Sequence, residues 1–365
     1  MTIMDTLYKK LLLFAAAMVF GLPVMAQEKV SKKVTKTYGF TNAGEVHLEN
    51  KYGNVNIYGW TKNEVSITVN ITVTHKKKDN AQELLERIRP VIRDSEDFIS
   101  MGYEIGETSS GFFSNLFDKA NPFDFDRSNV QIDYKVYMPE KAELEIINKF
   151  GDVFIEDWIG ILKADVQHGD MWINDNLNKA DVVIKYGKLR AKNINYGNLD
   201  LKNGGLDMDN SKTMRLNSAG SEIDMHTIGS LEFYSNKDEV DLEEVNTLYG
   251  MLKFSNIRLN RLGNDIDLVL KISDFAVENI INPSSKIAIE QESSEVSLNI
   301  MDFPHQFTAV VEEGLVRLPK SFYDVDSHML DKGKKLREIK ATYGKNPTGR
   351  ISITGNKGVV LLKEL

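Results

Sequence analysis

The chain has 365 residues and contains no cysteine. Disulfide bonds and thiolate metal sites are therefore excluded. A lipid-anchored bacterial protein needs a cysteine at its mature N-terminus, so this form of membrane attachment is excluded as well.

Long apolar runs are also scarce, and the longest lies near the N-terminus. Lys9 and Lys10 precede an apolar run at 11–24, which leads into Val24-Met25-Ala26. This pattern is typical of a secretory signal peptide, so we expect residues 1–26 to be removed and the protein to be exported. The run is shorter than the roughly 20 residues that span a bilayer, which makes an uncleaved anchor the weaker alternative. We expect no integral membrane span after cleavage.

Positive charge is in the minority, with 45 Lys and Arg against 53 Asp and Glu and a formal net charge of −8. Removing the signal peptide takes away Lys9, Lys10 and Asp5 and changes the net charge to −9. Nucleic-acid-binding proteins neutralise phosphates with Lys and Arg, so we expect no nucleic-acid partner.

Residues 27–147 are expected to form strands, one helix and a long loop that pack on or cap the rest of the chain. The clearest strand is 65–73, where Val and Ile alternate strictly with Ser, Thr and Asn. Asn80 is a candidate N-cap, and apolar residues at helical spacing predict a helix over about 80–93, which Pro90 should kink or shorten. Residues 106–129 are rich in Gly, Ser, Asp and Phe and predict a long loop.

From residue 148 onward the sequence is repetitive. The unit that begins at Phe150, Phe-Gly-Asp-Val-Phe-Ile, is echoed by His-Gly-Asp-Met-Trp-Ile and then by Tyr-Gly-Lys-Leu-Arg-Ala. The glycines of this unit recur at every eighteenth position and are Gly151, Gly169, Gly187 and Gly205. Second short strands lie between them, at 161–166, 181–184, 199–201 and 214–216. A strand therefore begins about every eight or nine residues, which is typical of an all-β fold.

A fixed internal period favours an all-β β-solenoid over residues 148–365, in which short strands are stable only when neighbouring coils stack. An antiparallel β-sandwich is the alternative. The expected inward residues are Val153, Ile155, Met171, Ile173, Leu199 and Leu201. The corners need positive φ, which we assign to Gly151, Gly169, Gly187 and Gly197 and to Asn193, Asn203 and Asn210. Stacked asparagines can also form hydrogen-bonded ladders.

Both ends of a solenoid must be covered against edge pairing. The N-terminal strands with their helix, and the final 350–362 region, are the expected caps.

The aromatic-Gly-Asp/Asn-apolar-x-apolar unit, the tail at 349–355 and the signal peptide together resemble the putative adhesin family of exported bacterial β-helix proteins, including its "head GIN" type. The resemblance covers nearly all of the chain after the signal peptide. It implies a right-handed β-helix and an adhesin-like role at the cell envelope. It transfers no catalytic residue, and the functional part of the resemblance is an analogy at the level of the fold.

The sequence offers no catalytic, metal-binding or cofactor-binding residues. None of the six histidines lies three to five positions from another, and His168 takes the place of an aromatic stacking residue. Asp152 and Asp170 stand at equivalent turn positions, where we expect turn capping and not calcium binding. The pairs Glu243-Glu244 and Glu312-Glu313 are adjacent, so on a strand their side chains should point to opposite faces.

The strongest contact candidate is the loop with Phe112, Phe113, Phe117, Phe123 and Phe125. Such dense aromatics mark a partner surface or fold back as a cap, and we hold both alternatives open. We expect an exported, non-catalytic interaction module that binds an unknown protein or glycan, located in the periplasm, at the outer membrane or at the cell surface. A carbohydrate-active enzyme and a structural or stress-related periplasmic protein are the alternatives.

Overall fold

The computed structural model describes residues 27–106 and 129–365, so the expected signal peptide and the phenylalanines at 112–125 lie outside it. The chain divides into a smaller unit, residues 1–32, 71–89 and 105–131, and a larger unit, residues 33–70, 90–104 and 132–365. Within the described ranges, no helix is both long and apolar enough to cross a bilayer.

The N-terminal elements are β1 (Glu28–Gly39), β2 (Glu45–Asn50), β3 (Val55–Trp60), β4 (Glu64–His75), α2 (Lys78–Arg87), β5 (Ile88–Asp94), β6 (Phe98–Ile105) and β7 (Val130–Pro139). The central strands are β8 (Glu143–Lys149), β9 (Val153–Glu156), β10 (Ile161–Gln167), β11 (Met171–Lys185), β12 (Lys188–Lys202), β13 (Gly205–Ala219), β14 (Glu222–Asn236), β15 (Glu239–Lys253), β16 (Asn256–Lys271) and β17 (Asp274–Ile280). The last strands are β18 (Lys286–Glu292), β19 (Glu295–Asn299), β20 (His305–Glu312), β21 (Leu315–Arg317), β22 (Tyr323–Asp331), β23 (Leu336–Tyr343), β24 (Gly349–Asn356) and β25 (Val359–Lys363).

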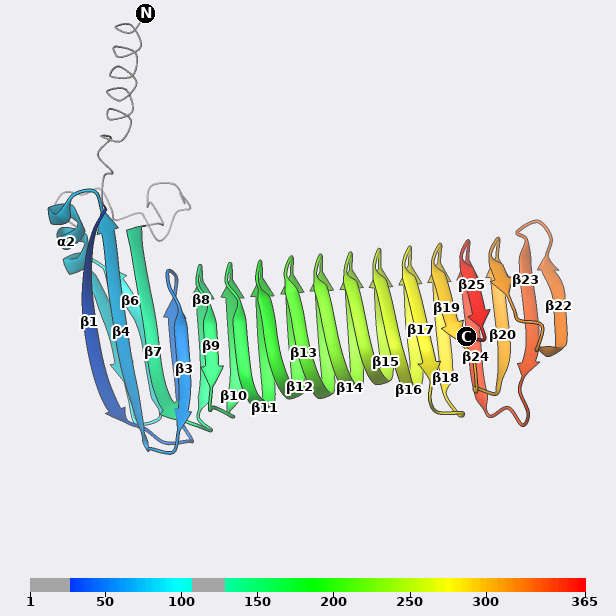
Figure 1. The fold of residues 1–365 in the computed structure, drawn as a ribbon, viewed down its shortest axis with the longest axis horizontal. Coiled ribbons are helices and arrows are strands. Elements are labelled where there is room, and N and C mark those ends of the chain that lie inside the picture. Colours follow the sequence, from blue (N-terminus) through cyan, green and yellow to red (C-terminus); the bar gives the residue numbers. More distant parts are fainter. Residues whose placement is uncertain (1–26, 107–128) are drawn as a thin grey trace, which may run out of the picture. The chain divides into compact units, whose positions relative to one another are not determined.

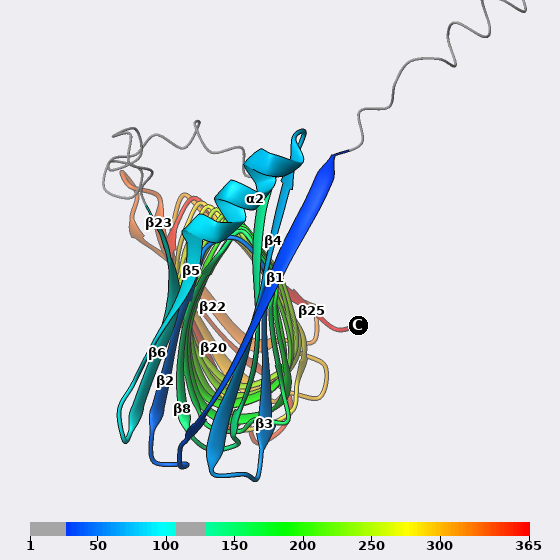
Figure 2. The same cartoon turned by 90° about the vertical axis from the view of Figure 1, so that its left-hand side faces the viewer.

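Each central coil of the larger unit is one long strand that bends once. The first half of β11 pairs in parallel with the first half of β12, and the second half pairs with the second half. Figure 1 shows these coils side by side, and Figure 2 shows them superposed along the stack with strands on both sides. Parallel pairing of successive coils confirms the all-β solenoid and excludes the antiparallel sandwich. Of the short second strands predicted from the sequence, 161–166 is the separate strand β10, and the other three are the second halves of β11, β12 and β13.

The core lies between the two halves of each coil. All six expected inward residues, Val153, Ile155, Met171, Ile173, Leu199 and Leu201, are buried. They alternate with outward polar or aromatic residues, because successive side chains of a strand point to opposite faces. The interior is almost entirely Leu, Ile, Val, Met and Phe.

The period is not constant along the stack. Met171 pairs with Leu189, which corresponds to a period of 18, whereas Leu177 pairs with Ile194, which corresponds to a period of 17. One residue is therefore lost at the corner, and the following coils keep the shorter spacing as far as β15. The spacing returns to 18 in the second half of β16. The neighbour of Gly187 in the next coil is consequently Gly204, and the assignment of Gly205 to this series is wrong: Gly205 pairs with Lys188.

The turn glycines act differently from the expectation. Positive φ falls on the residue before Gly151, Gly169, Gly187 and Gly204, with 58° at Phe150, 55° at His168, 58° at Tyr186 and 50° at Asn203. The glycines to which it was assigned, Gly151, Gly169, Gly187 and Gly197, lie outside that region. Of the three asparagines assigned positive φ, Asn203 alone has it. A Cβ on Gly169 would lie 1.9 Å from the carbonyl oxygen of Gly151. Glycine is therefore required there by the close approach of two coils, and not by its φ angle.

The stack does not end where the chain ends. β24 pairs in parallel with β18 and with β20, and β25 pairs in parallel with β19 and with β21. Residues 350–362 therefore form an inner coil, and their assignment as a cap is wrong. Beyond β20, the antiparallel strands β23 and β22 extend the sheet. At the other end, β2 and β3 pair with β8 and β9, so part of the 27–147 region belongs to the stack.

Helix α2 is shorter than expected. It begins at Lys78 with Lys77 as its N-cap, no side chain caps it, and it ends at Arg87. The second part of the predicted range forms β5, which contains Pro90. Proline disfavours the helical conformation of the preceding residue and lacks an N–H, so strand geometry prevails there.

Candidate binding site

The stack exposes two outer surfaces, formed by the first halves of the coils (the first face) and by the second halves (the second face). On the second face, one row runs through Val183, Asp200, Asn217, Tyr234 and Met251, each in register with the next. These side chains point outward because their strand neighbours are buried in the core. The row therefore runs perpendicular to the strands along the stack.

A second row runs beside it through Lys185, Lys202, Ala219, Asn236 and Lys253. The short side chains in its centre lie between long ones on β12 and β15. This difference in length leaves a groove of about 680 Å³ across β11 to β15. A volume of this size is typical of small-molecule and saccharide sites.

Two aromatic rings border the groove. Tyr234 is 40% exposed and Phe254, which follows β15, is 53% exposed. The Tyr234 hydroxyl donates a hydrogen bond to Glu232 Oε1 at 3.0 Å, and the Arg215 guanidinium lies 5.7 Å from the Tyr234 ring centre. The hydrogen bond to Glu232 raises the pKa of Tyr234 above its ordinary value. These contacts hold the phenol ring in a fixed orientation at the edge of the groove.

The floor of the groove is polar. Asn217 Nδ2 donates a hydrogen bond to Asp200 Oδ1 at 2.8 Å, and Asn236 lies one coil further along. Lys185, Lys202 and Lys253 make no ion pair with any described residue. Lys271, which pairs with Lys253 in the next coil, instead lies 3.8 Å from Glu292. The groove thus combines exposed rings, amides and cationic groups on a rigid sheet.

The first face carries a different arrangement. Phe154 and Trp172 stack with ring centres 4.4 Å apart and planes 6° apart, and Arg190 lies 5.1 Å from the Trp172 ring centre. Arg190 Nη1 also lies 3.0 Å from Asp170 Oδ2. Because the rings stack on one another, their faces are covered and mainly their edges are accessible. They form a rigid ridge.

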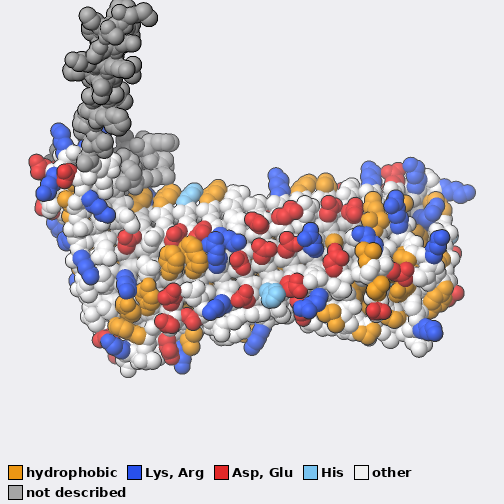
Figure 3. All heavy atoms as spheres, viewed as in Figure 1, with side chains coloured by type: hydrophobic (Ala, Val, Ile, Leu, Met, Phe, Trp, Pro, Cys, Tyr) orange, Lys and Arg blue, Asp and Glu red, His pale blue; other side chains and the backbone are white. Residues whose placement is uncertain are grey.

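Beyond this ridge, the same row continues through Asp207, Asp224, Asp241 and Arg258. These residues line an open hollow of about 580 Å³ together with His226. Figure 3 shows this surface, with hydrophobic, basic and then acidic side chains along the stack. Arg258 Nη1 lies 3.3 Å from Asp241 Oδ1.

Asp224 lies in the middle of the hollow. Among the described residues it makes no ion pair, while Asp207 lies 3.9 Å from Lys188 Nζ. Burial raises the pKa of Asp224 above its ordinary value, Lys188 partly offsets this rise, and the neighbouring carboxylates add to it. The hollow therefore favours the protonated form of this carboxyl relative to water.

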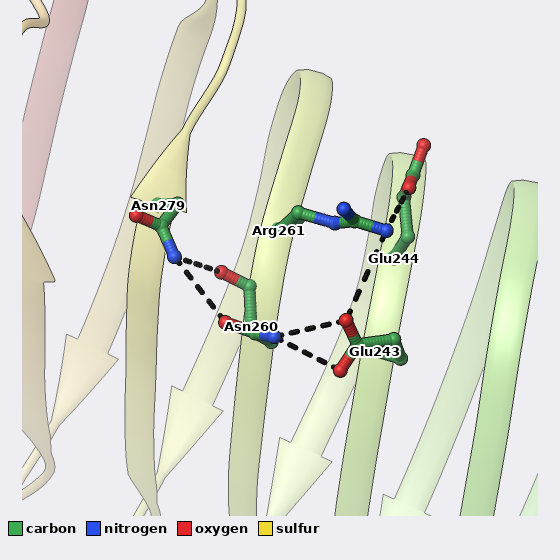
Figure 4. Close-up of polar contacts among 5 residues, drawn as sticks. All are labelled: Glu243, Glu244, Asn260, Arg261 and Asn279. Atoms are coloured by element: carbon green, nitrogen blue, oxygen red, sulfur yellow. Dashed lines mark hydrogen bonds and ion pairs between the residues drawn. The ribbon is translucent and has the colours of Figure 1, made fainter.

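Where the strands bend beside the hollow, polar side chains of neighbouring coils form a network (Figure 4). Arg261 Nη2 lies 2.7 Å from Glu244 Oε2 and 3.8 Å from Glu243 Oε1. Asn260 Nδ2 donates to both Glu243 oxygens, and Asn279 donates to Asn260. The expectation that Glu243 and Glu244 point to opposite faces is wrong here, because alternation breaks where the strand bends. Both carboxylates are used to hold Arg261 and Asn260.

The turn residues act as predicted. His168 stacks between Phe150 and Tyr186, with ring centres 4.9 and 4.8 Å away. Asp152 Oδ1 accepts a hydrogen bond from the backbone N–H of Asp170 at 2.9 Å, and Asp170 Oδ1 accepts one from Lys188 at 2.8 Å. These aspartates therefore cap the turn of the following coil.

The asparagine ladder is also present. Asn193 donates to Asn176, and Asn210 donates to Asn193 at 2.7 Å. Across 27–106 and 129–365, no three His, Asp or Glu side chains come together as a metal site.

Neither the groove of the second face nor the hollow of the first face was predicted from the sequence. Asp207, Asp224 and Asp241 recur at every seventeenth position, one residue less than the glycine repeat, so only a search at this shorter period reaches the row. The groove on the second face offers a weaker signal, because its members differ in type. The predicted contact residues at 112–125 lie outside the described residues.

Several solved structures are similar over most of their length, at low identity. A putative cell adhesion protein from Clostridium sporogenes is 11% identical, with 93% of this chain and 100% of that chain covered and a TM-score of 0.18. A putative adhesin from Parabacteroides merdae is 10% identical, with 92% and 97% covered and a TM-score of 0.30. A putative lipid binding protein from Parabacteroides distasonis is 9% identical, with 91% and 97% covered and a TM-score of 0.29.

No family model and no curated protein matches the chain. Membership of the adhesin family therefore stays a prediction.

Proposed function

We propose that the protein is a non-catalytic binding module of the bacterial cell envelope that holds a saccharide in the groove of the second face. The observation that supports this is the combination of exposed rings, Tyr234 and Phe254, with amides at Asn217 and Asn236 in one groove. Aromatic rings pack against the apolar faces of sugar rings, and amides exchange hydrogen bonds with hydroxyl groups. Together they match a ligand that is apolar on its faces and polar at its rim.

The size of the groove favours a saccharide over a protein partner. A stable protein interface buries roughly 800 Å² on each side and is mostly flat. A groove of about 680 Å³ instead encloses a few sugar rings. The rigid sheet supports this use, because the lining side chains are fixed by strand register and need little ordering on binding.

The test is a glycan array followed by calorimetric titration of the mature protein with the saccharides it retains. Replacing Tyr234 by alanine should weaken binding by about three- to tenfold, because it removes one aromatic contact. Tyr196→Ala is the matched control, since Tyr196 is 50% exposed and lies outside the groove lining. Equal losses of affinity in the two variants, or no binding to any glycan of the array, would contradict the proposal.

One observation favours a second function, saccharide hydrolysis in the first-face hollow. Asp207, Asp224 and Asp241 lie in successive coils, and neighbouring strands are about 4.8 Å apart. Retaining glycosidases use two carboxyl groups about 5 Å apart, one of them protonated, and Asp224 has a raised pKa. Release of reducing ends by the wild type, and its loss in Asp224→Asn, would establish this enzyme and overturn the non-catalytic assignment.

A further inference from the structure

We propose that the second-face groove selects anionic saccharides, and that its ligand is a linear chain lying along the stack with its charged groups near the two ends of the groove. This inference rests on the proposed function and names the ligand class for the same site. It depends on the placement of Lys185, Lys202 and Lys253.

The three lysines place positive charge in the groove, although the whole chain has a net charge of −8. None of them makes an ion pair among the described residues, although Lys271, next in the same row, is paired with Glu292. All three line the groove, with Lys202 exposed and Lys185 and Lys253 half-buried. A lysine in such a position packs its stem on apolar surface and keeps its ammonium group in water. A ligand carboxylate, phosphate or sulfate would therefore supply the charge that the protein does not.

The centre of the groove is formed by Asn217, Ala219 and Asn236 and carries no charge, and Asp200 on β12 bounds it on the side of Lys202. Asp200 lies in the lining beside Asn217, whose amide donates to it at 2.8 Å. A second anionic group at this point would be repelled by the Asp200 carboxylate. The cations of the lining lie on either side of the floor formed by Asn217, Ala219 and Asn236. The ligand should therefore be neutral in its middle and charged toward its ends.

The register sets the distance between the charges. Lys202 lies on β12 and Lys253 on β15, three coils further along the stack. With strands about 4.8 Å apart, their backbone positions are separated by about 14 Å. A single acidic sugar cannot reach both lysines, whereas an oligosaccharide of several rings can. Affinity should consequently rise sharply with chain length.

The experiment is a calorimetric titration of the mature protein with galacturonic acid, with tetragalacturonic acid that is methyl-esterified on its two middle rings (the acidic tetramer) and with the fully methyl-esterified tetramer, each at low and at high salt. We expect the acidic tetramer to bind at least about tenfold more tightly than the monomer and than the neutral ester. We expect added salt to reduce this preference, because exposed charges are screened.

The double variant Lys202→Gln, Lys253→Gln should lose the preference for the acidic tetramer. Its matched control, Lys179→Gln, Lys212→Gln, removes the same charge from exposed positions of β11 and β13 outside the groove lining. The control should keep the preference unchanged. An equal effect of the two double variants would overturn the inference, because it would reflect net charge alone.

Other outcomes separate this inference from the proposed function. If the neutral ester binds as tightly as the acid and Tyr234→Ala weakens both, the groove binds saccharides but does not select anionic ones. If neither the acidic tetramer nor a sulfated heparin tetrasaccharide binds more tightly than the ester, the inference fails. If dodecyl phosphate displaces the acidic tetramer and binds more tightly, the site takes an anionic lipid, and the saccharide assignment fails.

Discussion

Replacing Gly169 by alanine tests the close approach of the coils, because this glycine does not need its conformational freedom. Its φ lies outside the positive region, so alanine fits the backbone angle. The added Cβ, however, would lie 1.9 Å from the Gly151 oxygen and 2.6 Å from its carbonyl carbon. Ordinary contacts begin at 3.4 Å, so the two coils must separate locally by more than 1 Å.

The magnitude follows from the bonds that flank this contact. The Phe150 N–H donates to the Gln167 oxygen at 2.8 Å, and the Val153 N–H donates to the Asp170 oxygen at 2.9 Å. Losing both costs about 1–3 kcal/mol, and overpacking adds about 1–3 kcal/mol. We therefore expect Gly169→Ala to lower the free energy of unfolding by about 2–6 kcal/mol.

Urea unfolding of the protein, followed by far-ultraviolet circular dichroism, measures this loss. Gly39→Ala is the control, because a Cβ at Gly39 has no atom within 4 Å. Both substitutions restrict the unfolded chain to the same degree, so their difference isolates the contact between coils. Indistinguishable midpoints for the two variants would refute the reasoning. They would indicate that position 169 needs glycine for its backbone conformation and not for the contact between coils.

Three further perturbations test the turns and the core. His168→Asn tolerates the positive φ but loses two stacking contacts, so it should lower stability by about 1–3 kcal/mol, whereas His168→Phe should retain most of it; thermal melts of both variants measure this. Asn148→Ala removes the buried amide that donates to the Gly53 and Gly151 oxygens and should cost about 2–4 kcal/mol in urea unfolding, while Asn178→Ala at an exposed site should have no measurable effect. Burial lowers the pKa of His305 below 6.5, so in the range just below pH 6.5 this histidine is protonated in the unfolded chain and neutral in the folded one. Stability should therefore fall as the pH drops from about 6.5 toward the folded pKa. His305→Phe should flatten this slope in a series of melts between about pH 4.5 and 7. An unchanged slope would show that other groups carry the acid sensitivity.

The strands and the solenoid could be predicted because their signals are local. Val153 and Ile155, and their equivalents in the next coil, alternate with outward residues, and the alternation repeats at a fixed period. Short strands of this kind bury their apolar side only when coils stack, so the repeat itself indicates the architecture. The turn roles of His168 and Asp152 followed from the same comparison of equivalent positions.

The wrong predictions concern positions whose structure depends on contacts with residues far away in the sequence. The role of Gly151 depends on the carbonyl of Gly53 in the preceding coil, which no local pattern reveals. Arg350 to Leu362 carry strand signals that say nothing about their neighbours, and they pair with strands that lie much earlier in the sequence. At Glu243 and Glu244 the bend of the chain overrides the alternation of a straight strand.

The class of fold, the inward and outward residues of each coil and the absence of thiol chemistry follow from the sequence, since each depends on residue type and local period alone. Which side chains lie next to one another along the stack follows from the packing of the coils in three dimensions. The loss of one residue at the corner after Ile173 changes the period from 18 to 17 and sets which side chains meet in the rows of both faces. The groove with Tyr234 and three lysines exists because that register places short side chains between long ones, and stacking of distant segments sets it.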